Sequence, residues 1–241
     1  MKYMTENEFN IGVFISTPSV GDNIKRIATQ NTSIRTSYKG LEEAIPAARQ
    51  MEDDGVEVII SRRGTSSLLR ENLHIPVLSF PQSPLDALIS LKRVRQESRK
   101  VFLPSFRTRN DDIQLIGEIL GMELAQGIYT DSASLRQVIF DAVQNGFKVI
   151  IGGISTMRYA TEFGAEFYEL ITSETEVAET IENAKSVAMS QREQQAMARR
   201  YQAVMDSGSD GILMVDRDGM VTMINQVALG MLNIHREEAV G

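Results

Sequence analysis

The sequence predicts an α/β protein with two parallel-sheet lobes around a ligand cleft. Apolar runs and helical patterns alternate from residue 10 to about residue 172, as in parallel sheets joined by right-handed crossover helices. The alternation falls into two halves on either side of the basic stretch 91–100, where we expect the boundary between the lobes. Two lobes joined there would leave a cleft between their sheet edges, a usual place for a small ligand.

The predicted strands are short and almost wholly apolar, as strands covered on both faces are. They lie at 11–15, 56–60, 75–80, 101–106 and 149–151, with a weaker pattern at 167–171. The expected helices lie near 23–30, 41–51, 85–94, 113–120, 135–143 and 156–163. Each lobe is thus expected to be Rossmann-like or flavodoxin-like.

Helix start and stop signals support this alternation. Ser83 is a cap, Pro84 fits the first helical position and Asp86 adds an acid near the start of the helix. Asn110 begins another helix in the same way. Gly55, Gly121 and Gly146 follow helical patterns and predict their ends.

Composition excludes several classes of protein and site. The chain has 241 residues, 42% hydrophobic and 24% charged, which fits one or two globular domains. It has no cysteine, and its two histidines, His74 and His235, are far apart, so we expect no disulfide, metal or cofactor. The net charge of −7 argues against nonspecific binding of nucleic acid. No apolar run approaches the roughly 20 residues that cross a bilayer, so we expect no membrane partner and a cytoplasmic protein.

Small polar and basic residues crowd the end of the strand predicted at 56–60. These residues are Ser61, Arg62, Arg63, Gly64 and Thr65. Open α/β sheets bind ligands at that edge. We expect Gly64 to allow a tight turn, Thr65 or Ser66 to cap the next helix, and the helix amides and a guanidinium to suit a carboxylate or phosphate. An ordinary capped loop with solvated arginines is the alternative for the same residues.

A second candidate loop follows the strand predicted at 149–151. Gly152 and Gly153 would let a ligand approach the backbone, and Ser155 or Thr156 could cap the next helix. The predicted ligand-binding residues are Ser61, Arg62, Gly64, Thr65, Ser83, Gly152 and Gly153, and the predicted ligand is a small anion. No loop matches a dinucleotide or nucleoside-triphosphate motif.

These motifs resemble the N-terminal receptor domain of the propionate catabolism activators. The resemblance rests on 60–65, Ile75-Pro76-Val77, Ser83 with Asp86, and 149–153, and it covers roughly residues 10 to 190. That family has two α/β lobes that sense small metabolites, 2-methylcitrate in the propionate regulators. Its members commonly continue into a sigma-54-interacting ATPase and a DNA-binding helix-turn-helix. Arg63 stands where the family often has glycine, and Pro84-Leu85 replace a common Gly-Tyr.

The resemblance implies a metabolite-sensing input region, residues 1–190, of a sigma-54-dependent transcription activator. DNA and sigma-54 RNA polymerase would be contacted only through downstream domains. Two alternatives remain from the residues: a two-lobed isomerase or racemase of small acids, and a dimerisation module without a ligand. Against an enzyme, the sequence shows no cysteine nucleophile and no carboxylate–histidine constellation.

A long exit helix is predicted over 174–206. Ser173 and Glu176 match a capping box. Six residues, two of them polar, then repeat at alternating intervals of three and four, which is the spacing of a coiled-coil seam and predicts a homodimer. The seam consists of Val187, Ser190, Gln194, Met197, Tyr201 and Val204. A solvated linker helix is the alternative.

The remaining residues, 207–241, resemble the opening of a PAS sensor domain. Two apolar runs, 212–215 and 221–224, flank Asp218-Gly219, which predicts a hairpin. The sequence ends about halfway through such a domain, and we expect the segment to be loosely packed because half a PAS sheet buries little apolar surface.

Overall fold

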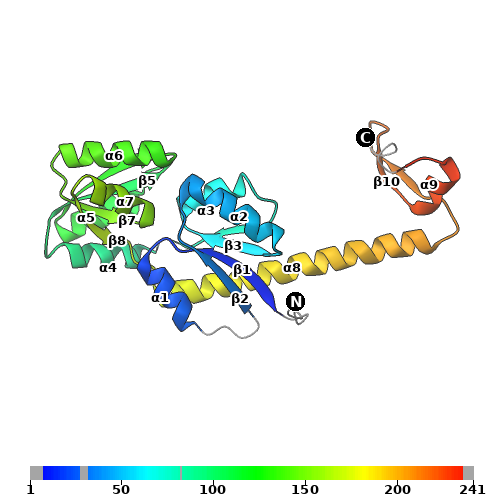
Figure 1. The fold of residues 1–241 in the computed structure, drawn as a ribbon, viewed down its shortest axis with the longest axis horizontal. Helices are drawn as coiled ribbons and strands as arrows, with labels where there is room; N and C mark the ends of the chain where they lie inside the picture. Colours follow the sequence, from blue (N-terminus) through cyan, green and yellow to red (C-terminus); the bar gives the residue numbers. More distant parts are fainter. Residues whose placement is uncertain (1–7, 28–31, 82, 236–241) are drawn as a thin grey trace. The chain divides into compact units, whose positions relative to one another are not determined.

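The computed structural model describes residues 8–27, 32–81 and 83–235. The chain divides into two compact units, Met1–Ala188 and Met189–Gly241. The first unit contains two four-stranded parallel sheets (Figure 1), which confirms the predicted α/β class with two lobes.

The first lobe is built on a sheet of strand order β2-β1-β3-β4. Its elements are β1 (Phe9–Phe14), α1 (Pro18–Arg26), β2 (Thr32–Ser37), the 3-10 turn η1 (Leu41–Glu43), α2 (Ala44–Asp53), β3 (Val58–Ser61), α3 (Arg63–Arg70) and β4 (Val77–Ser79). All pairings are parallel, with Ile11 opposite both Ile34 and Val58.

The second lobe repeats this order as β6-β5-β7-β8, again all parallel. Its elements are α4 (Pro84–Val94), β5 (Lys100–Phe106), α5 (Asp111–Leu120), β6 (Glu123–Tyr129), α6 (Ser132–Gln144), β7 (Val149–Gly152), α7 (Ile154–Glu162) and β8 (Glu166–Glu169). In both lobes the chain therefore reverses its winding direction between the two central strands.

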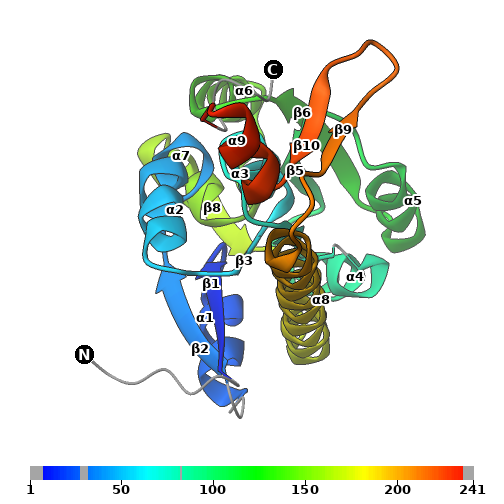
Figure 2. The same ribbon diagram turned by 90° about the vertical axis from the view of Figure 1, so that its right-hand side faces the viewer.

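Helices cover both faces of each sheet, because alternate side chains of a strand point to opposite faces. In the second lobe, Val149 and Ile151 face α4 and α5, whereas Ile150 faces α6 and α7. Figure 2 shows the two helix layers of this lobe from the side. In the first lobe, α1 and the start of α8 (Glu174–Ser207) cover one face, and α2 and α3 cover the other.

The chain crosses between the lobes twice. Helix α4 packs on the second sheet through Ala87, Leu91 and Val94, so the first crossing lies between β4 and α4. This position precedes the boundary that we expected near 91–100; those basic residues end α4 and lead into β5. The second crossing lies between β8 and α8, whose first turns return to the first sheet through Val177 and Ile181.

Two strands escaped prediction, and both are edge strands. β2 has the sequence TSIRTS and contributes only Ile34 to the apolar core, while β6 mixes polar residues with Leu124 and Ile128. Neither shows the continuous apolar run of a central strand, because an edge strand need not be buried on both faces. The predicted helix 23–30 begins earlier, at Pro18; residues 28–30 of that prediction lie outside the described residues.

Helix ends agree with the sequence signals at some positions and correct them at others. Ser83 caps α4 by accepting from the amides of Leu85 and Asp86 at 3.1 and 3.5 Å, as predicted. Gly121 ends α5 in the left-handed region, with φ of 64°. The predicted cap of α7 is wrong: Gly153 is the N-cap, and Ser155 and Thr156 lie inside the helix.

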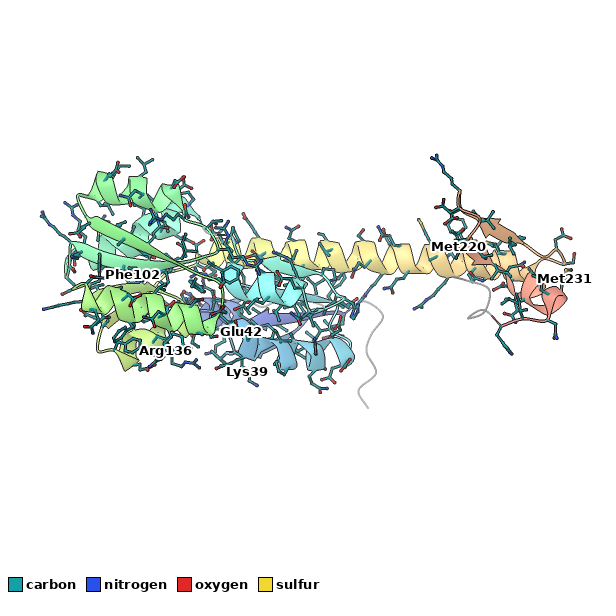
Figure 3. The ribbon with its side chains drawn as sticks, turned by 90° about the horizontal axis from the view of Figure 1, so that it is seen from above. Lys39, Glu42, Phe102, Arg136, Met220 and Met231 are labelled. Atoms are coloured by element: carbon teal, nitrogen blue, oxygen red, sulfur yellow. The ribbon has the colours of Figure 1, made fainter. Side chains whose placement is uncertain are left out.

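The second unit contains the end of α8 and a short antiparallel pair. Strands β9 (Leu213–Val215) and β10 (Val221–Ile224) form the predicted hairpin, and α9 (Gln226–Leu232) follows. Asn225 caps α9 at Ala228 and also donates from Nδ2 to the carbonyl oxygens of Met205 and Asp210. Met220 and Met231, labelled in Figure 3, are 47% and 67% exposed, so this unit buries little of its apolar surface.

No described helix combines the length and the apolar character that crossing a bilayer requires.

Candidate ligand cleft

The candidate site lies where the two sheets reverse their winding. β1 and β3 of the first lobe end at Phe14 and Ser61, shortly before Ser16 and Arg62, and β5 and β7 of the second lobe end at Phe106 and Gly152. Open sheets bind ligands at such switch points, because the helices diverge there on opposite faces. Two adjoining cavities between the lobes, of about 110 and 80 Å³, are lined by these strand ends.

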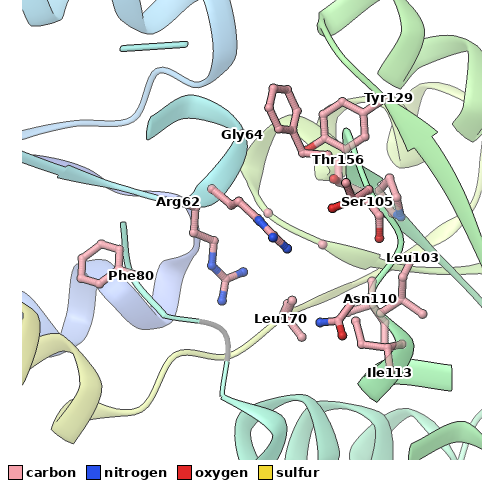
Figure 4. A pocket seen from close by; sticks show the side chains of 17 residues that line it. Arg62, Gly64, Phe80, Leu103, Ser105, Asn110, Ile113, Tyr129, Thr156 and Leu170 are labelled. Atoms are coloured by element: carbon pink, nitrogen blue, oxygen red, sulfur yellow. The ribbon is translucent and has the colours of Figure 1, made fainter. Parts of the chain in front are cut away.

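The two cavities form one candidate cleft. Both are lined by the same central residues, Arg62, Gly64, Tyr129, Gly153 and Thr156. A single water needs about 10–15 Å³ of such volume, so the larger cavity accommodates a molecule of several heavy atoms. Figure 4 shows Arg62 on one side of the larger cavity and Leu103, Asn110 and Ile113 on the other. The cleft therefore pairs a cationic side with a partly apolar one.

Arg62 is the charged group at the centre of this cleft. Its Nη2 donates to Thr172 Oγ1 at 2.8 Å and to the Ile171 carbonyl oxygen at 3.3 Å, both in the second crossing. Burial lowers the pKa of Arg62 to about 10, a change that the charges of Asp86 and Glu169 oppose. The guanidinium is therefore still protonated at pH 7. The ion pairs formed among the described residues do not include it.

Gly64 does not form the tight turn expected of it, and both Gly64 and Gly153 let the lobes approach closely. Gly64 lies in the first turn of α3, where a Cβ would come within 3.2 Å of Phe106 and 3.3 Å of the Tyr129 hydroxyl, both in the second lobe. A Cβ on Gly153 would lie 3.0 Å from the carbonyl oxygen of Ser16 in the first lobe. At that distance the Ser16 backbone would have to shift by a few tenths of an ångström, so both glycines favour the close contact between the lobes.

Thr65 and Ser61 have different surroundings from those predicted. Helix α3 begins at Arg63 with Arg62 as its N-cap, so neither Thr65 nor Ser66 caps it. Thr65 Oγ1 instead accepts from the Leu41 amide at 2.9 Å, and Thr65 lines the smaller cavity. Ser61 is buried at the end of β3 and lines the same cavity.

Six of the seven predicted site residues therefore line the two cavities. Gly152 lines the larger one, where a Cβ would collide with Thr156 of its own lobe. Ser83 does not line either cavity; it caps α4 at the first crossing. Arg63, which stands where the family often has glycine, is exposed at the margin of the larger cavity.

Sequence reasoning missed Tyr129, which lines both cavities. Burial raises its pKa to about 12, so the phenol is neutral and can donate a hydrogen bond. Tyr129 ends the edge strand β6 and precedes Asp131, the capping residue of α6. That aromatic residue followed by a helix cap was the signal that could have revealed it.

The helices differ in whether a side chain caps their N-termini. Ser83, Asn110 and Asp131 cap α4, α5 and α6 with their side chains. Within the described residues, no N-cap side chain serves α1, α3 or α7. The amide of Ser19 in α1 donates instead to the carboxylate of Glu169, 3.1 Å away in the second lobe. A carboxylate thus already occupies one of these three helix N-termini, which are favourable places for anions.

Asp86 and Glu176 form a second polar group beside the cleft, at the two crossings. Asp86 accepts from the Ser173 amide at 2.9 Å. In the predicted capping box, Glu176 would accept from this amide, so Asp86 takes its place. The other bond of the box, from the Glu176 amide to Ser173 Oγ at 3.3 Å, is present. Burial, and next the hydrogen bond with Asp86, raise the pKa of Glu176 to about 7.

One solved structure supports the two-lobed fold, and others resemble the chain more weakly. An NtrC family transcriptional regulator from Clostridium acetobutylicum superposes with a TM-score of 0.71 at 18% identity, covering 76% of this chain and 98% of that chain. A conserved domain protein from Vibrio cholerae has a TM-score of 0.41 at 12% identity, covering 72% and 77%. A glutamate racemase from Aquifex pyrophilus has a TM-score of 0.34 at 16% identity, covering 73% and 83%. The last two similarities are too weak to imply a shared chemistry.

Family models identify the chain more directly. No curated protein matches it. Residues 199–240 match a PAS domain, as the resemblance of 207–241 predicted. Residues 28–194, more than half of the chain, match the model described as propionate catabolism activator, and the chain therefore belongs to that family.

Proposed function

We propose that this chain is the signal-sensing input region of a sigma-54-dependent, NtrC-type transcription activator, and that it binds a small anionic metabolite between its lobes. Family membership and the fold of the Clostridium acetobutylicum regulator support the regulatory part. The cleft at the switch points of two sheets supports the binding part.

The half-buried guanidinium of Arg62, which has no ion-pair partner among the described residues, is the observation that carries this proposal. Withdrawing a cation from water, even in part, is costly unless an anion compensates it. Arg62 lines both cavities, and of its five N–H donors only those on Nη2 have partners in the described structure, both neutral. Asp86 and Glu169 act on Arg62 through their charge but form no ion pair with it, and a carboxylate or phosphate in the cleft would supply that direct partner. Uncapped α3 would add backbone donors beside it.

The residues around the cleft favour sensing over catalysis. A racemase or isomerase of small acids needs a general base placed near the substrate. Among the described residues that line the two cavities there is no carboxylate, histidine or cysteine, and the only amine is Lys39. Tyr129 holds its proton too tightly to act as a base near pH 7.

The exit helix is our candidate for transmission. Its N-terminus is tied to the second lobe, because the amide of Ser173 donates to Asp86 in α4. Its next turns pack on the first lobe through Val177 and Ile181. A change in the angle between the lobes would therefore act directly on α8. We propose that residues 187–204 of α8 form a homodimer and that α8 carries the change in lobe angle along this dimer. Further domains would then act on DNA and sigma-54 polymerase, in the cytoplasm.

The proposal can be tested by identifying any small molecule that stays bound to the protein during purification. Native mass spectrometry of the purified protein, followed by calorimetry with the released compound and a panel of small acids, should show saturable binding without turnover. Turnover of the bound acid would instead indicate an enzyme. A protein that binds cationic or neutral compounds but no anion would refute the role of Arg62.

A further inference from the structure

Residues 40–43, here called the clasp, connect the first lobe to the second outside the two crossings. They lie between β2 and α2 of the first lobe. Three consecutive side chains, Leu41, Glu42 and Glu43, each contact a different part of the second lobe. In Figure 3, Glu42 lies where the lobes meet, at one end of the helix that carries Arg136.

Leu41 is buried in the core of the other lobe. It is 3% exposed and belongs to the apolar cluster of Phe102, Phe106 and Ile139 in the second lobe. Its φ of 50° lies in the left-handed region, which is unfavourable for a bulky residue. The bond from its amide to Thr65 Oγ1, at 2.9 Å, helps to hold this conformation. A strained backbone that is kept in order to bury a side chain across the cleft points to a role in lobe contact.

Glu42 binds the N-terminus of α6. Its two carboxylate oxygens accept from the Ser132 amide at 3.2 and 3.3 Å, and Oε2 also accepts from the Ser132 hydroxyl. Asp131, the capping residue of α6, already serves the Ser134 amide at 2.7 Å. Glu42 therefore adds a second anion to the same helix end, where the helix dipole favours negative charge.

Two weaker contacts complete the clasp. Glu43 pairs with Arg158 of α7 at 2.7 Å, but both side chains are more than half exposed, so this pair contributes little. Gly40 faces Ser155, whose hydroxyl would lie 2.5 Å from a Cβ at position 40. The clasp backbone thus packs directly against the start of α7.

We propose that the clasp is the closure element of this receptor: its seating on the second lobe holds the cleft shut and sets the balance between closed and open lobes. Because Lys39, Gly40 and Leu41 also line the smaller cavity, an effector in the cleft would contact the clasp only when it is seated. The proposed closure of the lobes by the clasp does not depend on an effector. The effect of closure on effector affinity rests on the proposed function.

The size of the effect follows from Glu42. A hydrogen bond to a charged group contributes about 1.5–3 kcal/mol, so loss of the carboxylate charge should shift the ratio of closed to open protein toward open by roughly 10- to 150-fold. Effector affinity falls in proportion to the closed fraction.

Distance measurement between spin labels tests the clasp without an effector. The chain has no cysteine, so Asp53→Cys and Glu118→Cys place one label on each lobe at exposed positions. Glu42→Gln and Leu41→Gly should each raise the open population in the distance distribution by about tenfold or more. Glu162→Gln is the matched control, because Glu162 pairs with Arg136 within the second lobe, and it should leave the distribution unchanged.

If the parent protein is almost wholly closed, a single substitution would leave the open form too rare to detect, so the combined variant Leu41→Gly/Glu42→Gln is also measured. Circular dichroism verifies the fold of this variant. It should be mainly open. Lobes that stay closed in this variant, or a parent that is open throughout, would overturn the clasp. Calorimetry with the panel of small acids separates the two proposals. If the combined variant has open lobes and the parent binds an anion, both proposals are supported. If the combined variant stays closed and the parent binds no anion, both the clasp and the anion site are refuted.

Discussion

Replacing Arg62 by alanine removes the charge that we place against the effector, and it also removes two hydrogen bonds to the second crossing. A charge-assisted hydrogen bond to the effector is worth about 1.5–3 kcal/mol, so Arg62→Ala should weaken binding by roughly 10- to 150-fold. Arg63→Ala should have a much smaller effect, because Arg63 is exposed at the cavity margin.

The second role of Arg62 needs its own control. Thr172→Val removes the Oγ1 acceptor at 2.8 Å but keeps Arg62 and its bond to the Ile171 carbonyl. Thr172 also remains tied to the first lobe, because its carbonyl oxygen accepts from Asn23 Nδ2 at 2.9 Å. We expect Thr172→Val to destabilise the fold by about 1–3 kcal/mol, the scale for a buried polar group that loses its partner, and to change effector affinity only a few-fold.

Isothermal titration calorimetry with the identified effector decides between the two roles. Strong loss in Arg62→Ala with near-normal binding in Thr172→Val supports direct contact with the effector. Equal losses in both variants would mean that Arg62 acts by positioning the crossing. Normal binding by Arg62→Ala would remove the main support for the anion site.

Three further predictions concern other parts of the chain. The raised pKa of Glu176, about 7 against an ordinary value near 4.5, means that the folded protein prefers the protonated carboxyl. Its contribution to stability is complete below about pH 4.5 and is lost as the pH rises through 7, so Glu176→Gln should flatten the fall of the melting temperature over that range; an unchanged slope would contradict the assignment. Met197 and Tyr201 are 57% and 70% exposed on α8, and replacing both by glutamate should shift the oligomer toward monomer in light scattering, whereas an unchanged mass would refute the seam. Amide exchange should be far faster in β9 than in β3, because the residues of β9 are all exposed and those of β3 all buried; equal protection would contradict loose packing of the second unit.

Much of the fold could be predicted because the central strands and the capped helices depend on local pattern. Strands β3 and β7 are almost entirely apolar, since helices cover both faces, and Ser83-Pro84 marks the start of α4 by itself. The edge strands β2 and β6 lack that pattern. The position of the lobe boundary also depends on packing, since nothing local in α4 shows on which sheet it lies.

Only those features of the site that arise within a single lobe could be predicted from the sequence. Strand ends such as Ser61-Arg62 and Gly152-Gly153 follow from the topology of one sheet, and the structure brings them together. What each residue does there depends on the opposite lobe. Gly64 is small because Phe106 and Tyr129 approach it, and not because a turn requires it.

The same reasoning explains why the clasp is invisible in the sequence. Glu42 and Ser132 are 90 positions apart, and in isolation Glu42 belongs to a short acidic run before a helix, which normally faces solvent. Its partner is a helix end that already has a cap, so no local signal calls for a second anion. A carboxylate therefore gains a defined role only when the lobes meet, and interlobe contacts of this kind can change between closed and open states without disturbing the fold of either lobe. That property suits residues that regulate closure, and it makes the effect of Glu42→Gln on lobe distance, rather than on stability, the informative measurement.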